Sequence, residues 1–185
     1  MKLTFQFILL ISLSSCGLTN RFESSSDYAI DGQFERYVTY DVVNNNGLSI
    51  DQNAAIAKGI NLQLGALGFS PSVDQPSLYV YYQLYIERFE FMSLEQPSLD
   101  NWLVIKDYQA IEATEGWRSV NRKSVGQTLM IVLFDPLLGQ EVWKGSISRP
   151  TFSSGYDYQS AAQAVLYRHM ILTRDLGKPS HIPVD

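Results

Sequence analysis

The sequence predicts an α+β domain with a single, mostly antiparallel or mixed sheet of about five strands and two helices packed on one face. Segments of alternating or β-branched residues recur along the chain, and two other segments carry the three- and four-residue spacing of amphipathic helices. Hydrophobic residues make up 45% of the chain, enough to form a core, and a length of 185 residues suits one domain.

The first residues have the order of an export signal that ends in a lipid-attachment site. A positive start at Lys2 precedes the apolar run Leu3–Leu13, which is too short to cross a bilayer as a helix. Residues 13–16, LSSC, resemble the lipobox of bacterial lipoproteins, in which the cysteine thiol receives a diacylglycerol and the signal is cut before it. Cys16 is the only cysteine, so no intramolecular disulfide can form.

We therefore expect residues 1–15 to be a lipoprotein signal peptide and Cys16 to carry acyl chains that anchor the protein to a membrane. Two alternatives remain open: ordinary secretion with cleavage after Gly17, and an uncleaved anchor. Gly17 stands where an Asp would resemble the inner-membrane retention signal of enteric lipoproteins. By this analogy, the expected location is the cell envelope, at the periplasmic leaflet of the outer membrane.

Residues 16–33 are expected to be the lipidated cysteine and a flexible tether, because this stretch is polar and contains a serine run. The folded α+β domain is then expected at 34–177, followed by a tail at 178–185. On this division, a chain that begins at Phe34 should melt within about 2 °C of a longer soluble form.

The domain is expected to begin with a strand and a helix. Residues 34–43 are rich in β-branched and aromatic side chains, which favours a strand. Residues 49–52, SIDQ, form a capping box, in which Ser49 accepts a hydrogen bond from the third helical amide. The helix that follows ends at Gly68, and its apolar stripe consists of Ala57, Ile60, Leu64 and Leu67.

A long strand is predicted at 77–91, where apolar and polar residues alternate. The apolar set changes parity at Phe89, which predicts a bulge or a bend near Glu87 and Arg88. Residues 102–113 are expected to hold a further strand, and residues 115–124 a loop.

The last part of the domain is predicted to be a hairpin and a second helix. Residues 127–135 and 140–148 have strand character, and Asp135 followed by Pro136 favours the turn between them. The second helix is expected at 156–176, with Gly177 at its end.

Several short motifs resemble the Domain-of-Unknown-Function-4136 family, whose members are mostly bacterial lipoproteins. They are the strand end Phe134-Asp135, the segment EVWKG at 141–145, the helix end LGF at 67–69 and the alanine-rich last helix. The resemblance covers about Phe34 to Leu176, and it departs from the family at 75–77, where many relatives carry acidic residues beside the proline. It implies an α+β fold and an envelope location. It implies no activity, so no catalytic residue is carried over.

The sequence contains few groups suited to catalysis. No nucleophile elbow, phosphate-binding loop, dinucleotide fingerprint or zinc-protease motif is present, so we expect no enzyme activity, no cofactor and no metal. The carboxylates weighed for acid–base work are Glu87, Glu90 and Asp135, and a solvated strand face or turn chemistry explains each of them. A net charge of -5 without a basic stripe argues against nucleic acid as a partner.

Two surfaces are candidates for binding. The first is an anion-binding loop, with a solvated loop as the alternative interpretation, and its residues are Trp117, Arg118, Arg122 and Lys123. The second is a sheet face that carries Tyr79, Tyr81 and Tyr85 together with apolar residues of the strand 128–134. That strand is apolar on both faces, so something must cover its second face. Residues 93–125 are one candidate cover, and a partner protein or an apolar ligand is the other.

From these features we expect a non-catalytic cell-envelope lipoprotein that binds or supports another envelope component, either a protein or the cell wall. The alternative is a ligand-binding domain that holds a small lipid or glycan between sheet and loop. The third hypothesis is an uncharacterised enzyme.

The substitution Cys16→Ser tests the anchor. Because each buried methylene contributes roughly 0.8 kcal/mol to membrane binding, loss of the acyl chains should move the protein from the membrane pellet to the soluble fraction. Labelling by a palmitate analogue, followed in cells beside the parent protein, should also disappear. A variant that still pellets with membranes and takes up the label would contradict lipidation at this residue.

Overall fold

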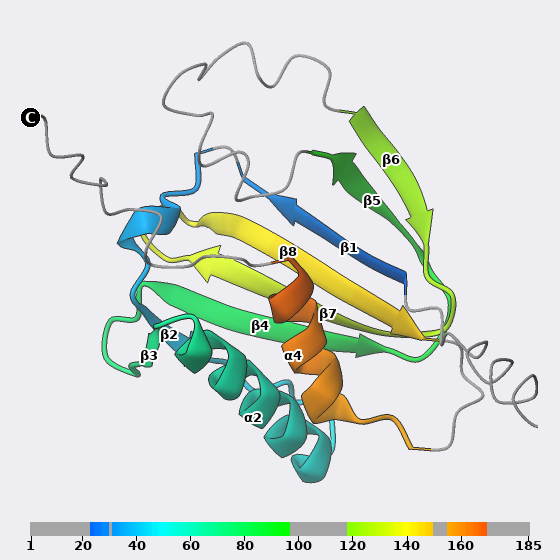
Figure 1. Cartoon of the computed structure of the whole chain (residues 1–185), viewed down its shortest axis with the longest axis horizontal. Helices are drawn as coiled ribbons and strands as arrows, with labels where there is room; N and C mark the ends of the chain where they lie inside the picture. Colours follow the sequence, from blue (N-terminus) through cyan, green and yellow to red (C-terminus); the bar gives the residue numbers. More distant parts are fainter. Residues whose placement is uncertain (1–22, 30, 97–117, 150–154, 170–185) are drawn as a thin grey trace, which may run out of the picture.

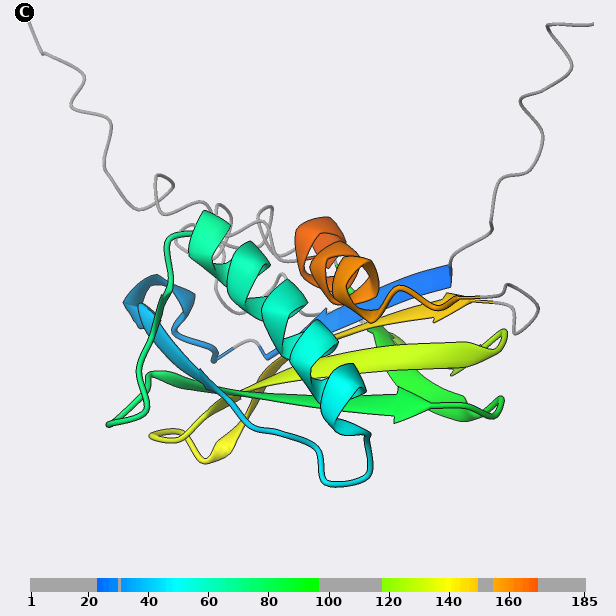
Figure 2. The same cartoon turned by 90° about the horizontal axis from the view of Figure 1, so that it is seen from below.

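The computed structural model describes residues 23–29, 31–96, 118–149 and 155–169 (Figure 1). In this part of the chain, helices α2 (Ile50–Ala66) and α4 (Tyr158–His169) lie together on one face of a six-stranded sheet (Figure 2). The predicted α+β class is confirmed, as is the placement of two helices on one face. The strand number differs, because six strands form this sheet and two more form a second, small sheet.

The main sheet has the strand order β1-β8-β7-β4-β2-β3. Neighbouring strands are antiparallel, except that β2 runs parallel to both β3 and β4. The bounds of the strands are β1 (Glu23–Tyr28), β2 (Thr39–Val42), β3 (Ser70–Pro71), β4 (Leu78–Tyr85), β7 (Gln127–Asp135) and β8 (Gln140–Arg149).

The ends of α2 follow the predicted local signals. Ser49 Oγ accepts from the Gln52 amide at 3.2 Å, and the Gln52 side chain accepts from the Ser49 amide at 2.9 Å, which completes the capping box. Gly68 has a φ of 87°, the left-handed conformation that ends a helix. Inside the helix, a Cβ on Gly59 would lie 2.4 Å from the carbonyl oxygen of Gln159, so this glycine lets α2 approach α4.

The core lies between the helices and the sheet. Of the predicted α2 stripe, Ile60 and Leu64 are fully buried, whereas Ala57 and Leu67 are only partly buried; Ile56 also faces the core. On β8, the Trp143 ring lies over Gly145, where a Cβ would come within 2.2 Å of it. The described part of α4, within the predicted helix at 156–176, covers this pair through Val165 and its neighbours.

The predicted tether at 16–33 is wrong where the structure describes it, because residues 23–28 form strand β1. This strand pairs with β8 along its whole length, from Glu23 opposite Ser148 to Tyr28 opposite Trp143. The segment is polar because its inner side chains meet other hydroxyls: Ser25 Oγ lies 2.9 Å from Ser146 Oγ. Hydrophobic periodicity therefore gave no signal for it, and the domain begins before Phe34.

The predicted strand at 34–43 is shorter than expected. Phe34–Arg36 forms a 3-10 turn, η1, and β2 begins only at Thr39. Phe34 turns into the core between Tyr28 and Tyr37, with edge-to-face ring contacts of 6.5 and 5.8 Å. These aromatic contacts override the β propensity of the segment.

Strands β5 (Glu90–Glu95) and β6 (Arg118–Lys123) form the second sheet and extend the β4–β7 pair around a bend (Figure 1). The register is the same in both arms: Tyr79 is opposite Phe134 in one, and Glu95 is opposite Arg118 in the other. The bend predicted near Glu87 and Arg88 is therefore confirmed, and the alternative of a bulge is not needed. Residues 118–123, which were expected to lie in a loop, form a strand instead.

The bent ribbon folds back onto the face of the sheet that the helices leave free. Asp27 Oδ1 accepts from Ser93 Oγ at 2.7 Å and from the Leu94 amide at 3.0 Å. The Gln96 side chain accepts from the Tyr28 amide at 3.0 Å and donates to the Tyr28 carbonyl at 2.8 Å. These bonds tie β5 to the edge strand β1 and occupy part of an edge that would otherwise be open.

Several predictions lie outside the described residues, namely Cys16, the strand at 102–113, Trp117, the end of the second helix and the tail at 178–185. Within the described residues, no helix has both the length and the apolar character needed to cross a membrane.

Because β1 is part of the sheet, removing it should lower the melting temperature, whereas removing a tether would leave it unchanged. A soluble form that begins at Phe34 loses the buried Tyr28 ring and the Asp27 anchor of the ribbon, so it should melt at least about 10 °C below a form that begins at Gly17. Differential scanning calorimetry of the two forms measures this. Melting temperatures within about 2 °C of each other would show that β1 adds no stability.

Candidate functional site

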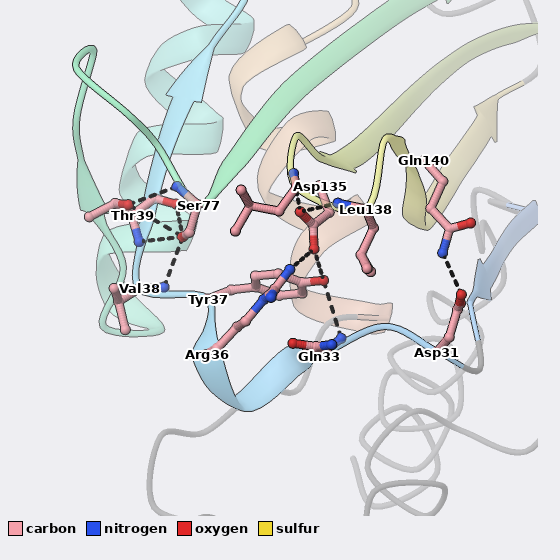
Figure 3. Close-up of polar contacts among 11 residues, drawn as sticks. Asp31, Gln33, Arg36, Tyr37, Val38, Thr39, Ser77, Asp135, Leu138 and Gln140 are labelled. Atoms are coloured by element: carbon pink, nitrogen blue, oxygen red, sulfur yellow. Dashed lines mark hydrogen bonds and ion pairs between the residues drawn. The ribbon is translucent and has the colours of Figure 1, made fainter.

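Asp135 is the most strongly bound carboxylate of the described residues, and it lies at the turn between β7 and β8 (Figure 3). Burial by itself raises the pKa of this carboxyl, but the hydrogen bonds to it outweigh burial and hold the pKa below its usual value. Its donors are Arg36 Nη2, Tyr37 Oη at 2.8 Å, the Leu137 amide at 2.7 Å and the Leu138 amide at 3.1 Å.

The same cluster makes Tyr37 a poor acid. Burial, and then its hydrogen bond to Asp135, raises the pKa of the Tyr37 hydroxyl to about 12. A carboxylate that is already bound by a guanidinium, a phenol and two amides has no free lone pair aimed at a substrate. The Asp135 cluster therefore joins η1 to the β7–β8 turn, and its arrangement does not suit a general base.

The two glutamates weighed as acid–base groups are both exposed. Glu87 lies at the bend of the ribbon, and Glu90 forms an ion pair with Lys123 at 2.7 Å. Among the described residues, no group of three or more histidine, cysteine or acidic side chains is placed to hold a metal ion.

The structure places Tyr79, Tyr81 and Tyr85 on the sheet face opposite the helices, as their alternation predicts. Tyr81 is 42% exposed, and its ring contacts Tyr79 at 6.3 Å and Phe134 edge-on at 6.2 Å. Val132 is the cross-strand neighbour of Tyr81 in the register. We call the surface formed by Tyr79, Tyr81, Tyr85, Val132 and Phe134 the tyrosine face. Its role in an interaction stays a prediction.

The ribbon covers only part of the second sheet face. Strands β5 and β6 lie over β1 and β8, whereas β4 and β7 keep Tyr81 and Gln83 exposed. The described ends of the segment 93–125 thus provide a cover for one half of this face. The tyrosine face is in the other half, beside a hollow of about 430 Å³ that Gln83, Met130 and Lys144 help to line.

The predicted anion-binding residues lie on strand β6, so the expectation of a loop is wrong. Arg118 stands opposite Glu95, Arg122 opposite Phe91, and Lys123 opposite Glu90. The loop prediction failed because a strand paired only with β5 needs no apolar periodicity of its own. Trp117 lies outside the described residues, so its relation to these cations stays a prediction.

Arg122 and Lys123 line a cavity of about 490 Å³ between the ribbon and the sheet, which we call the serine cavity. Its floor was not among the predicted sites, because the strand character of β1 was not recognised. The remaining described residues that line it are Phe91 and Asn121 from the ribbon and Ser24, Ser25, Ser146 and Ser148 from the sheet.

The buried hydroxyls of this floor satisfy one another. Ser25 Oγ pairs with Ser146 Oγ, and Ser148 Oγ lies 2.7 Å from Thr128 Oγ1. Since a buried hydroxyl without a partner is costly, these pairs allow the ribbon to cover a polar surface. The alternation of Ser146 and Ser148 with Ile147 in β8 was the one sequence signal for such a row.

Comparison with known families gives one match, to the family described as a domain of unknown function, DUF4136, over residues 24–169. The chain belongs to the DUF4136 family. This confirms the predicted resemblance, and the match begins inside β1, ahead of the predicted domain start at Phe34. The family motifs lie at structural positions, which are the Asp135 turn, the Trp143–Gly145 contact and the Gly68 helix end.

The solved structures that match this DUF4136 chain share little sequence with it. A PDZ domain protein from Parabacteroides distasonis has a TM-score of 0.49 and 11% identity, over 89% of this chain and 39% of that protein. Two PelC dodecamers from Paraburkholderia phytofirmans have 11% identity with this chain, with TM-scores of 0.44 and 0.43. The matches cover 79% of this chain and 95% and 96% of the PelC chains. This chain thus spans less than half the length of the first of these proteins. The comparison with curated proteins gave no match.

Two neighbouring tyrosines test whether the tyrosine face is open. Tyr81→Ala should change the free energy of unfolding by less than about 0.5 kcal/mol, because its ring is partly in solvent. Tyr82→Ala, the matched control, removes a ring that is only 4% exposed and that donates to Asn53 Oδ1 at 2.6 Å, and it should cost about 3 kcal/mol or more. Urea titrations give both values, and a large cost at Tyr81 would mean that the face is covered.

Proposed function

We propose that this DUF4136 protein is a non-catalytic lipoprotein of the cell envelope that holds a partner protein on its tyrosine face. The observation that carries the proposal is the exposure of Tyr81 in the middle of a sheet whose other face is closed by two helices. Cys16 supplies the membrane anchor in this proposal, and the outer membrane is the proposed location.

The composition of the tyrosine face suits a protein partner. A tyrosine ring offers apolar area at a low cost in side-chain entropy, and its hydroxyl tolerates water while the surface is free. Tyr79, Tyr81 and Phe134 already hold one another in ring contacts, so a partner would meet a pre-arranged surface. Exposed clusters of this kind are typical of interaction sites.

A lysine beside the face is already paired within the domain, and Glu141, opposite Phe134 in the register, is exposed. Lys144, which lies next to Val132 in the sheet register, forms an ion pair with Asp27 at 3.4 Å. A partner would therefore gain contact area at the aromatic residues without having to neutralise a buried charge. This favours an interface with an apolar centre and a polar rim.

That the protein is not an enzyme is part of the proposal. This part rests on the surroundings of the three carboxylates considered as acid–base groups. Asp135 is saturated by donors, Glu87 is exposed at the bend, and Glu90 is paired with Lys123. Each arrangement has a structural explanation that needs no substrate.

Site-specific photocrosslinking in intact cells tests the partner proposal. A photoreactive amino acid at Tyr81 should give a discrete adduct of fixed mass with one envelope protein, identified by mass spectrometry. The same amino acid at Leu62, which is exposed on α2 on the opposite side of the sheet, should not give this adduct. Identical adducts from both positions, or none from Tyr81, would contradict a partner on the tyrosine face.

A further inference from the structure

The serine cavity combines a cationic wall, formed by Arg122, with a polar floor. Arg122 and Lys123 are the charged residues among the described residues that line it, and no carboxylate is among them. This is notable in a chain with a net charge of -5. An anion that enters the cavity meets the guanidinium of Arg122, which shares a ribbon face with Phe91, together with the serine hydroxyls of the floor. Lys123 is paired with Glu90 on the other face of the ribbon.

Arg122 is the cation best placed to bind such an anion. Lys123 is already paired with Glu90, Lys144 with Asp27, and Arg36 with Asp135. Within the described part of the chain, Arg122 has no ion pair, and its guanidinium stays solvated in the cavity wall. A planar guanidinium can bind two oxygens of a phosphate group at once.

The floor of the cavity argues for a polar ligand group and against an acyl chain. Ser25, Ser146 and Ser148 are buried there and Ser24 is half-buried, while Asn121 at the opening is exposed. An apolar tail placed against hydroxyl groups would gain little from burial. A charged head group could instead accept a hydrogen bond from the Ser25–Ser146 pair, because each hydroxyl carries one proton and the pair uses only one of the two.

The cavity is close in sequence to the proposed membrane anchor, which points to a membrane lipid as the origin of the anion. Ser24 and Ser25 line it, and they lie at the start of β1, on the side of Cys16. The residues between Cys16 and Glu23 can span at most about 25 Å even when fully extended. A lipidated Cys16 therefore keeps the cavity within that distance of the bilayer surface.

We propose that the serine cavity binds the phosphate of an anionic phospholipid head group in the membrane that holds the anchor, with Arg122 as the principal contact. The inference rests on the proposed function in one respect, the lipidation of Cys16, which brings the cavity to the bilayer. Binding of a head group would orient the domain on the membrane surface. Because the chain as a whole is acidic, this contact would be local and would depend on the anchor for its effective concentration.

Vesicle flotation tests the site without the anchor. A soluble form that begins at Gly17 is mixed at low ionic strength with vesicles of phosphatidylcholine alone, or with vesicles that also contain phosphatidylglycerol. The protein should float at least about five-fold more with the anionic vesicles. Arg122→Gln should lose about five-fold in this binding. Arg122→Lys should lose less than Arg122→Gln, because it keeps the charge but not the two-oxygen contact of the guanidinium.

Lys58→Gln is the matched control, since it removes the same charge from an exposed position on α2, away from the ribbon. It should bind anionic vesicles within about two-fold of the parent. Equal flotation with both kinds of vesicle, or an Arg122→Gln variant that binds like the parent, would overturn the proposal.

Inorganic phosphate separates a lipid head group from a free anion. Titration of the soluble form with phosphate, followed by calorimetry, should give no saturable binding at millimolar concentrations. Arg122-dependent phosphate binding without vesicle binding would assign the cavity to a soluble anion and reject the lipid. A failed vesicle test leaves the Tyr81 crosslinks and the Cys16 label unaffected, so the two proposals can fail separately.

Discussion

The fold-back of one long two-stranded ribbon onto its own sheet governs the surfaces of this protein. Because β4 and β7 continue into β5 and β6 without a change of register, the ribbon can turn only by bending as a unit. Its far arm then covers β8 and β1 and is fixed there by Asp27 and Gln96. The tyrosine face and the serine cavity both result from where this arm stops.

The fold-back is compatible with a buried polar surface because the covered groups satisfy one another. The hydroxyl pairs of Ser25 with Ser146, and of Thr128 with Ser148, remove the desolvation cost that a buried row of serines would otherwise carry. An apolar row would make a tighter core there, but it would leave no polar cavity. The ribbon thus encloses a polar pocket on one side of the sheet, while the helices enclose an apolar core on the other.

The two ends of the sheet have different tasks in this arrangement. At the β7–β8 turn, Asp135 receives four hydrogen bonds and joins η1 to the hairpin, so this end is held rigidly. At the other end, the bend carries exposed residues and leads into the serine cavity, close to the start of β1. Both proposed contacts, with a partner protein and with the membrane, therefore use the face that the helices leave free.

The sequence by itself determined the features that depend on neighbouring residues: the capping box at Ser49, the left-handed Gly68, the Asp135 turn, the bend near Glu87 and the family. It also predicted which tyrosines share a face, because alternation follows from the backbone alone. It did not predict that 23–28 and 118–123 are strands, because those polar segments are stabilised by pairing with β8 and β5. Nor did it decide that Tyr81 stays exposed while Ser146 is buried, since solvent exposure depends on where the ribbon's far arm lies, and only the tertiary structure sets that position.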